Sequence, residues 1–517
     1  MILTVDLGTS VTKVVVWGDD GQVVIGRSPL QCTYSSGNRA EQDPSSWWPS
    51  VVSACGSARS SLGASAAKVF GAIEALGFAA ARQTFVPVTA DATPLGAALL
   101  WSDRRAHAEA AALAASFGDD GARSLRRRTG LWLDAGSVAA KMKWLEDHEP
   151  QRIKTARWLL APRDLVAWRL TGEVSTDHTL ASATGLFELS GAGKGASGEN
   201  DGDAAGIGAN HGDGDLGPLV AGLVDTDTVA EKLPCSRPSH SVLGGLLEGP
   251  AGELGVPAGI PVVIGGGDRA CEVLGTGASD SWPMVSWGTT ANVSVPLPRL
   301  GDSTPDAMIV TRGALGGWLL EGGLSAAGSL VDWLARLAGL DTDSLMDRAR
   351  WSPPGSRGVI VLPWLGGARA PWWRDTARGA VVGLSFDHDV GDMARAVIES
   401  VAWDVQRCLE SATAARTGST DPVGLVLAGG GSNSALWTEI LAAVTGLPVR
   451  RRRSGEAASA GAAMLVARAT GVSLGLDDDG EGTSDTEMSP DAAMVQCYAS
   501  LRPGVDAAAA AVIELGR

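Results

Sequence analysis

A strand–turn–strand segment at residues 1–17 constrains the fold of this chain more than any other feature. Apolar, β-prone residues 1–5 lead to Asp6, a turn of Gly8-Thr9-Ser10 follows, and residues 12–17 form a second β-prone run. Such a turn can direct backbone N–H groups and two hydroxyls toward a phosphate, while the carboxylate faces the metal ion bound to that phosphate. Taken alone, the segment fits an ordinary hairpin with a polar turn equally well.

The same arrangement recurs far along the chain. Residues 284–287 lead into a turn of Gly288-Thr289-Thr290, and residues 291–295 form the next β-prone run. A later apolar run at 424–428 ends in Gly429-Gly430-Gly431, where bare backbone can approach a ligand closely. Two phosphate-type hairpins favour two similar domains that bind one nucleotide.

Length and charge narrow the class of protein. A chain of 517 residues is too long for one core, so two or more domains are expected. The formal net charge of −16 argues against nucleic acid or an anionic membrane as a partner. The first residues contain no signal-peptide apolar region, and no apolar run approaches the roughly 20 residues of a membrane span. The six cysteines are scattered without a C-x-x-C pair, which predicts a reduced, cytoplasmic protein without structural zinc.

The expected organisation has three parts. They are a first domain over residues 1–279, a second over 280–472, and a tail over 473–517. In the tail we expect an acidic linker over 477–487 and an Ala-rich helix over 506–515.

Residues 191–217 differ in composition from the rest of the chain. They are dominated by Gly, Asp, Ala and Asn, so they have almost nothing apolar to bury and predict a flexible surface insertion. Within them, residues 191–194 are similar to part of a phosphate loop. The spacing fails and no strand precedes them, so we discount that function.

A carboxylate follows another apolar run. Residues 261–264 are β-prone and end in Gly265-Gly266-Gly267-Asp268. Asp268 at that point suits a general base at the floor of a cleft, although a turn or helix-cap aspartate is the alternative. The segment also fits G-x-G-x-x-A, but no βαβ unit with a ribose-binding acid follows, which disfavours a dinucleotide site.

Residues 363–399 carry the most specific pattern. The segments 363–371, 375–379 and 392–399 resemble, nearly position for position, the second signature of the FGGY carbohydrate kinases. The first signature is similar at 141–148 (KMKWLEDH), although Val138 stands where a small or hydroxyl residue or Pro is usual. The D-x-G-T-S, G-G-G-D, W-G-T-T and late G-G-G motifs also follow the family's order, so the resemblance covers roughly residues 1–470.

This resemblance implies an α/β fold of two actin-like (ribonuclease H-like) ATPase domains with an interdomain cleft for ATP. It also implies transfer of the γ-phosphoryl group of ATP to a sugar or polyol hydroxyl. Asp6 would hold Mg²⁺ through water, and Asp268 would take the proton from the attacking hydroxyl. The nucleotide-binding residues that the resemblance implies are Gly8, Thr9, Ser10, Gly288, Thr289, Thr290, Gly429, Gly430 and Gly431.

The sequence constrains the identity of the sugar or polyol that accepts the phosphoryl group less than it constrains the reaction. Candidate acceptor-binding residues are Arg82, Gln83, Trp101, Asp268 and Arg269. Glycerol kinases have Gln-Arg-Glu-Thr where this chain has Ala-Arg-Gln-Thr at 81–84, and xylulokinases commonly have Gln-Met-His-Gly there. Residues 41–48 and 265–268 are more similar to xylulokinases. Arg269 stands where Asn, Gln or Ala is usual, and it could bind a substrate oxygen, lower the pKa of the base, or point away.

We therefore predict an ATP-dependent carbohydrate kinase of the xylulokinase-like branch. D-Xylulose is the first candidate acceptor, and another ketose, a pentitol or glycerol are alternatives. An actin-like ATP-binding switch or an inactive pseudokinase are alternatives of another class, which the FGGY signatures and Asp268 disfavour. The abundant tryptophans fit a homodimer face or core packing equally well.

Overall fold

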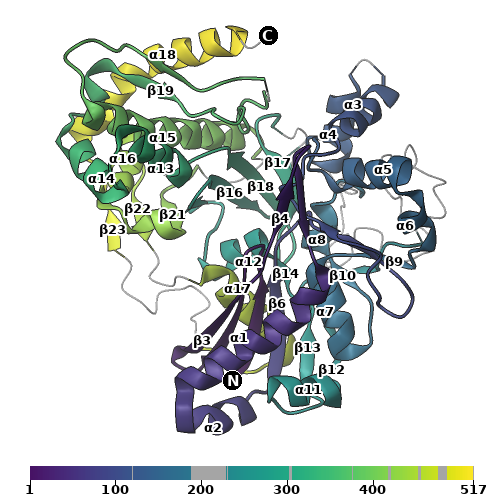
Figure 1. Cartoon of the computed structure of the whole chain (residues 1–517). Helices are drawn as coiled ribbons and strands as arrows, with labels where there is room; N and C mark the ends of the chain where they lie inside the picture. Colours follow the sequence, from purple (N-terminus) through teal and green to yellow (C-terminus); the bar gives the residue numbers. More distant parts are fainter. Residues whose placement is uncertain are drawn as a thin grey trace. The chain divides into compact units, whose positions relative to one another are not determined.

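The computed structural model describes residues 1–118, 120–187, 229, 231–301, 305–374, 376–416, 421–451, 456–475 and 486–515. The chain forms two compact units. Figure 1 shows the chain coloured by residue number, from the N-terminus to the C-terminus. Unit 1 comprises Met1–Gly277, Val310–Trp318 and Glu456–Gly482, and unit 2 comprises Ala278–Ile309, Leu319–Gly455 and Thr483–Arg517. The expected insertion at 191–217, with the segment 191–194, lies outside the described residues.

Unit 1 is built on a mixed seven-stranded sheet. Its order is β12-β13-β6-β1-β2-β3, and β14 also pairs with β6. The hairpin predicted at residues 1–17 is confirmed, because β1 and β2 are antiparallel with Leu7 opposite Thr12. The strands are β1 (Ile2–Leu7), β2 (Val11–Gly18), β3 (Gly21–Pro29), β6 (Ala75–Ala80), β12 (Val242–Gly245), β13 (Pro261–Val263) and β14 (Gly266–Gly267).

Unit 1 also contains smaller sheets and its helices. Three small sheets contain β4 (Thr33–Ser35), β5 (Arg39–Gln42) and β8 (Ala98–Leu99); β7 (Val86–Val88) and β9 (Trp158–Leu160); and β10 (Thr176–Asp177) and β11 (Ser236–Arg237). The described helices are α1 (Trp47–Leu62), α2 (Ala66–Gly71), α3 (His107–Ser116), α4 (Gly121–Thr129), α5 (Val138–His148), α6 (Pro150–Thr155), α7 (Pro162–Thr171), α8 (His178–Ser182), α11 (Glu248–Leu254), α12 (Asp268–Gly275) and α17 (Ala457–Thr470).

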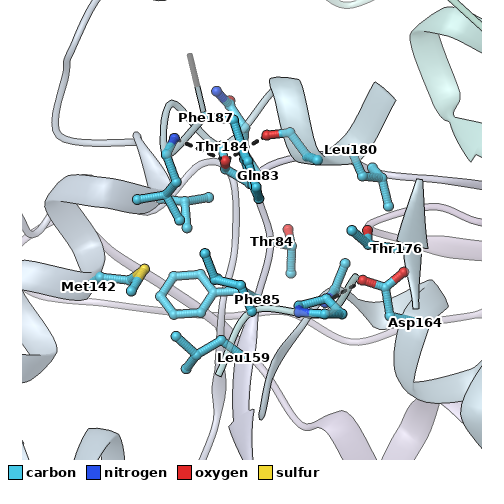
Figure 2. Close-up of a pocket in the computed structure, with 16 residues that line it drawn as sticks. Gln83, Thr84, Phe85, Met142, Leu159, Asp164, Thr176, Leu180, Thr184 and Phe187 are labelled. Atoms are coloured by element: carbon cyan, nitrogen blue, oxygen red, sulfur yellow. Dashed lines mark hydrogen bonds between the residues drawn. The ribbon is translucent and has the colours of Figure 1, made fainter. Parts of the chain in front are cut away.

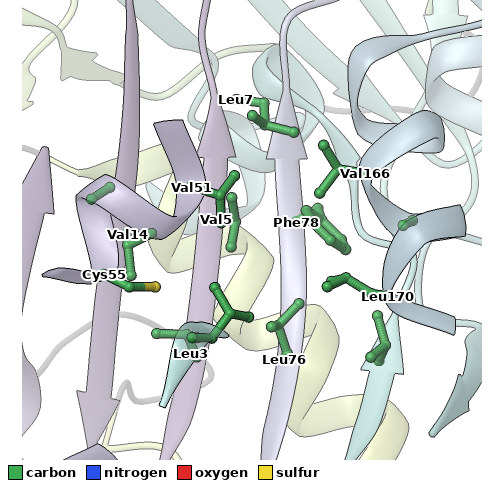
Figure 3. Packing of buried hydrophobic residues seen from close by; sticks show 14 of the residues in the cluster. Leu3, Val5, Leu7, Val14, Val51, Cys55, Leu76, Phe78, Val166 and Leu170 are labelled. Atoms are coloured by element: carbon green, nitrogen blue, oxygen red, sulfur yellow. The ribbon is translucent and has the colours of Figure 1, made fainter. Parts of the chain in front are cut away.

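Alternation along β1 divides its side chains between two apolar layers. Leu3, Val5 and Leu7 pack with Val51 of helix α1 and Val166 of helix α7, as Figure 3 shows. Ile2, on the opposite face, belongs to a second cluster with Ala460 and Val466 of helix α17. Because side chains alternate with a period of two, Asp6 lies on the face that α17 covers.

Helices α12 and α17 pack backbone to backbone. A Cβ at Gly461 would lie 1.9 Å from the carbonyl oxygen of Cys271, and a Cβ at Gly275 would lie 2.0 Å from that of Ala457. Only glycine allows this approach at both positions. Helix α17 therefore belongs to compact unit 1, so the units do not coincide with the expected sequence division at residue 472.

A second seven-stranded sheet has the order β17-β18-β16-β15-β21-β22-β23. Its strands β16, β15, β21, β22 and β23 belong to unit 2. Here β15 is antiparallel to β16 and parallel to β21, just as β1 is antiparallel to β2 and parallel to β6. The strands are β15 (Met284–Trp287), β16 (Ala291–Leu297), β17 (Ile309–Arg312), β18 (Trp318–Leu324), β21 (Leu425–Ala428), β22 (Val449–Arg451) and β23 (Thr486–Met488); β19 (Ile360–Leu362) and β20 (Ala380–Val382) form a separate pair. The described helices are α13 (Gly328–Ala338), α14 (Thr342–Trp351), α15 (Val390–Ala414), α16 (Ala435–Thr445) and α18 (Ala492–Leu515).

The tail differs from the sequence prediction in two respects. The terminal helix begins at Ala492 rather than 506 and contains Pro503, because ion pairs of Arg502 with Glu410 and of Asp506 with Arg407 attach it to α15 on both sides of the proline. The predicted linker also contains part of a strand: Glu487 lies in β23 and pairs with Arg450 at 2.9 Å, while linker residues 477–485 are outside the described part of the chain.

No helix in the described residues combines the length and apolar character that a membrane crossing requires.

Candidate active site

Three parallel strands of unit 1 end side by side and deliver three charged side chains. In the register of the sheet, Ala80 of β6 lies between Leu7 of β1 and Gly267 of β14. Asp6 lies near the end of β1, Arg82 follows β6, and Asp268 follows β14 as the first residue of α12. The sheet order therefore brings together residues that are widely separated in the sequence.

Arg82 and Asp268 form an ion pair. The Nε atom of Arg82 lies 3.5 Å from Oδ1 of Asp268, and the Asp268 side chain is 49% exposed. A Cβ at Gly267 would lie 2.7 Å from Cδ of Arg82, so the bare backbone at this position leaves room for the guanidinium. The carboxylate is thus reachable by a ligand, and the hydrogen-bond donors of Arg82 lie next to it.

Asp6 is buried among charges of both signs. Burial raises the pKa of its carboxyl to about 7; Lys13, whose Nζ lies 3.6 Å away, opposes this shift, and the negative charges of Asp268 and Glu456 add to it. Lys13 also pairs with Glu456 at 2.9 Å. A cation near Asp6 would offset the repulsion among these three carboxylates.

The oxygen donors near Asp6 fit magnesium. The carboxylate and the hydroxyls of Thr9 and Ser10 are hard oxygen ligands. Among the described residues, no group of three or more His, Cys, Asp or Glu side chains could hold a metal. Magnesium at nucleotide sites usually keeps several waters and is bound through one or two carboxylates and the phosphates of the substrate.

The Gly8-Thr9-Ser10 turn is fixed from several sides. The indole Nε1 of Trp101 donates to Oγ1 of Thr9 at 3.0 Å, and Nε2 of Gln42 donates to the Thr9 carbonyl at 2.9 Å. The amide of Leu30 donates to the Ser10 carbonyl at 2.8 Å. Trp101, which the sequence predicts to contact the sugar or polyol substrate, is therefore hydrogen-bonded to the turn that is predicted to bind phosphate.

Gln83 and Arg269 have partners within unit 1. Gln83 has a left-handed backbone with φ of 60°, and its Nε2 donates to the carbonyl of Ala183 at 3.2 Å. The guanidinium of Arg269 pairs with Glu272, one helical turn along α12, while its backbone amide donates to Oδ1 of Asp268 at 2.7 Å. Of the two arginines, Arg82 is the one whose guanidinium pairs with the candidate base.

A buried ionic network behind Asp268 was not found from the sequence. Arg163 is fully buried, pairs with Asp164 and Asp177 at 2.8 Å each, and donates to the carbonyl of Ile264 at 2.6 Å. Asp177 accepts from the Thr179 hydroxyl, which accepts from the amide of Gly267 at 2.7 Å. The network holds the backbone that leads to Asp268, but residue type alone does not distinguish a buried arginine from a solvated one.

In unit 2, the two predicted nucleotide-binding segments lie next to each other. Parallel pairing places Ser286 of β15 opposite Ala428 of β21, so the turn at 288–290 and the glycines at 429–431 follow neighbouring strand ends. Gly429 has φ of +82°, and a Cβ there would lie 2.6 Å from the carbonyl oxygen of Trp287. Thr289 and Thr290 are exposed.

The chain matches known carbohydrate kinases along most of its length. The family models for the N-terminal and C-terminal domains of the FGGY family of carbohydrate kinases match residues 1–192 and 284–470. The xylulose kinase of Escherichia coli (strain K12) is 29% identical over 90% of this chain and 89% of that protein. The glycerol kinase of Leptothrix cholodnii is 31% identical over 92% of each.

The fold has solved counterparts as well. A crystal structure of xylulose kinase from Rhodospirillum rubrum superposes with a TM-score of 0.85 at 23% identity, over 99% of each chain. The chain belongs to the FGGY family of carbohydrate kinases. This confirms the predicted family, the two-domain α/β fold and the phosphotransferase class, and a kinase of this family implies ATP as the phosphoryl donor.

Proposed function

We propose that this protein transfers the γ-phosphoryl group of ATP to a hydroxyl of a ketose, with D-xylulose as the first candidate. The observation that carries the proposal is the Arg82–Asp268 pair, next to Asp6 at the ends of three parallel strands. One exposed carboxylate can accept a proton, and the adjacent guanidinium can donate hydrogen bonds to an acceptor oxygen. A base and an orienting hydrogen-bond donor both assist the attack of an alcohol on a phosphoryl group.

The roles of the residues follow from their chemistry. Asp268 takes the proton of the attacking hydroxyl, which contributes roughly 10²- to 10⁴-fold in rate. Arg82, with Gln83, Trp101 and Arg269 as further candidates, orients the acceptor. Effective phosphoryl transfer depends mainly on such positioning and on neutralisation of charge.

The nucleotide contacts complete the proposal. Backbone N–H groups and hydroxyls of the turns at 8–10 and 288–290 bind phosphates, and the glycines at 429–431 approach the nucleoside or its α-phosphate. Asp6 would hold Mg²⁺ through water. When bound, that ion neutralises charge on the transferred phosphoryl group.

Glycerol or another polyol is the second candidate acceptor. The specific observation in its favour is Arg82 itself, since an arginine stands at this position in the Gln-Arg-Glu-Thr motif of glycerol kinases. A xylulose kinase and a glycerol kinase each match the chain over about nine tenths of its length. The xylulokinase-like choice rests on residues 41–48 and 265–268.

A panel of acceptors tests the proposal. ADP release is coupled to a dehydrogenase readout with ATP and Mg²⁺, and D-xylulose, other ketoses, pentitols and glycerol are compared by kcat/KM. We expect D-xylulose or a related ketose to rank first. Activity on glycerol with none on any ketose would overturn the choice of acceptor, and ATP turnover that no acceptor stimulates would favour the ATP-driven switch.

Three finer predictions belong to the same proposal. The first is that residues 1–279 bind the phosphoryl acceptor and residues 280–472 bind the nucleotide. The second is a cytoplasmic location, and the third is a homodimer. Light scattering of the purified protein tests the last of these, with a monomer at micromolar concentration as the contradicting result.

A further inference from the structure

Lys141 of α5 is a fully buried lysine with two backbone partners. Its Nζ donates to the carbonyl of Gln83 at 2.7 Å and to the carbonyl of Leu100 at 2.9 Å. The ring centroid of Phe85 lies 5.9 Å from the same nitrogen. One side chain therefore joins the segment that contains Arg82 and Gln83 to the segment that contains Trp101.

These two segments also pair directly, but only over a few residues. The amides of Phe85 and Leu99 each donate to the other's carbonyl, at 3.3 and 3.0 Å, and the amide of Trp101 donates to Oγ1 of Thr84 at 3.1 Å. Gln83, where Lys141 attaches, has a φ of 60° that residues other than glycine rarely adopt. Such strain persists only where surrounding contacts hold the backbone in place.

Packing around the segment is incomplete on one side, where a cavity of about 50 Å³ lies against it. Figure 2 shows Gln83, Thr84 and Phe85 around this space, with Met142 of α5 on one side and Leu180 of α8 on another. Dispersion contacts are lost wherever side chains leave a space unfilled. On that side, directed hydrogen bonds contribute to fixing the geometry of residues 82–84.

We propose that Lys141 is a positioning residue for the acceptor site: it holds residues 82–84 and 100–101 together so that Arg82 and Trp101 keep their places beside Asp268 and Thr9. The inference rests on the proposed function, because it assigns acceptor binding to these residues. It adds a role for a lysine that touches neither the acceptor nor the nucleotide.

The chemistry of the amine suits this role. Burial lowers the pKa of Lys141 to about 7, with Asp103 and Asp134 opposing the shift and Arg104 and Arg105 adding to it. A neutral amine has two N–H bonds, which matches its two carbonyl acceptors. The link is therefore retained in either protonation state.

Lys232 offers a matched control. It is also buried, its pKa is also lowered by burial, and its Nζ donates to the carbonyls of Ile153 and Lys154 at 2.6 and 3.2 Å. Neither of these carbonyls belongs to residues 82–84 or 100–101. Lys232→Met thus reproduces the loss of a buried, doubly bonded lysine without disturbing the proposed link.

The first measurement is steady-state kinetics of the full chain with the acceptor that ranks first in the panel. We expect Lys141→Met to raise KM for the acceptor about tenfold or more while KM for ATP changes less than about twofold. Lys141→Gln, which keeps two N–H donors, should recover part of this loss, and Lys232→Met should leave both KM values within about twofold of wild type. An acceptor KM in Lys141→Met equal to that of wild type, or an equal rise in both KM values, would overturn the proposal.

The second measurement needs no substrate. Hydrogen–deuterium exchange of the free protein should show faster exchange of peptides that contain Phe85, Leu99 and Trp101 in Lys141→Met, but not in Lys232→Met. If wild type phosphorylates no acceptor, the proposed function fails while this measurement still tests the link. If Lys141→Met does not fold, Lys141→Gln takes its place in both measurements, because it alters the same two hydrogen bonds. Exchange and an acceptor KM equal to those of wild type in Lys141→Gln would then overturn the proposal.

Discussion

Arg82 reaches Asp268 through its Nε atom, at 3.5 Å from Oδ1, although β6 and β14 lie in distant parts of the sequence. The pair exists because both strands run parallel and end at the same edge of the sheet. A proton acceptor and an orienting hydrogen-bond donor close together both assist phosphoryl transfer to an alcohol. The first two predictions test these two roles separately.

Asp268→Asn should lower kcat by about 10²-fold or more, because the amide cannot accept the proton of the attacking hydroxyl. KM for ATP should change little. The measurement is coupled ADP release at saturating acceptor. Asp343→Asn, a change of an exposed aspartate in the first turn of α14, serves as the control and should retain wild-type kcat. Turnover that survives in Asp268→Asn would show that another group is the base.

Arg82→Met should lower kcat/KM for the acceptor by roughly 10- to 150-fold, since a hydrogen bond from a charged donor contributes about 1.5–3 kcal/mol. The loss should appear mainly in KM for the acceptor. Arg127→Met removes an exposed arginine that pairs with Asp120 and should leave both constants near wild type. A loss confined to KM for ATP would contradict the assignment of Arg82 to the acceptor.

Gly429→Ala should destabilise unit 2 and weaken binding of MgADP. The backbone at Gly429 has φ of +82°, and the new methyl group would lie 2.6 Å from the Trp287 carbonyl oxygen, so we expect a cost of about 1–3 kcal/mol or more. Gly430→Ala is the matched stability control, because a Cβ there would meet no heavy atom within 4 Å. Thermal unfolding and calorimetric titration with MgADP check both variants; equal stability of the two would contradict the prediction.

Arg163→Met should lower the free energy of unfolding by about 3–5 kcal/mol, because it leaves the carboxylates of Asp164 and Asp177 buried without their cation. Arg169→Met, on the same helix, removes a surface pair with Glu253 and should cost about 0–1 kcal/mol. Urea unfolding of the full chain measures both. A cost for Arg163→Met no larger than that for Arg169→Met would contradict the structural role of the network.

The stability of the protein should depend on pH through Lys141. Its pKa is about 7 in the folded protein, against 10.5 for an ordinary lysine, so between these values the unfolded chain binds more protons. The free energy of unfolding should therefore rise with pH across this window, by up to about 1.4 kcal/mol per pH unit, in wild type relative to Lys141→Met. Urea unfolding of both proteins at pH 7, 8 and 9 checks the sign, and a difference between them that does not change with pH would contradict it.

Local patterns were sufficient to predict the two hairpins and the family. The turn Gly8-Thr9-Ser10 lies between β1 and β2, and the turn at 288–290 lies between β15 and β16, because β-prone runs joined by a tight polar turn determine a hairpin locally. The terminal helix begins earlier than predicted and contains Pro503, a residue that local rules disfavour inside a helix. Its contacts with α15, through Arg502 and Asp506, were not visible in the sequence.

The sequence by itself singled out Asp6, Asp268 and the turns at 8–10, 288–290 and 429–431 as candidates for the chemistry, since each follows a β-prone run. Only the tertiary structure decided which side chains lie next to these residues. Arg82 rather than Arg269 pairs with Asp268, Lys13 and Glu456 surround Asp6, and Lys141 joins residues 83 and 100. The physical reason is that strand order, register and burial arise from packing between distant segments, whereas turn and strand propensities act over a few neighbouring residues.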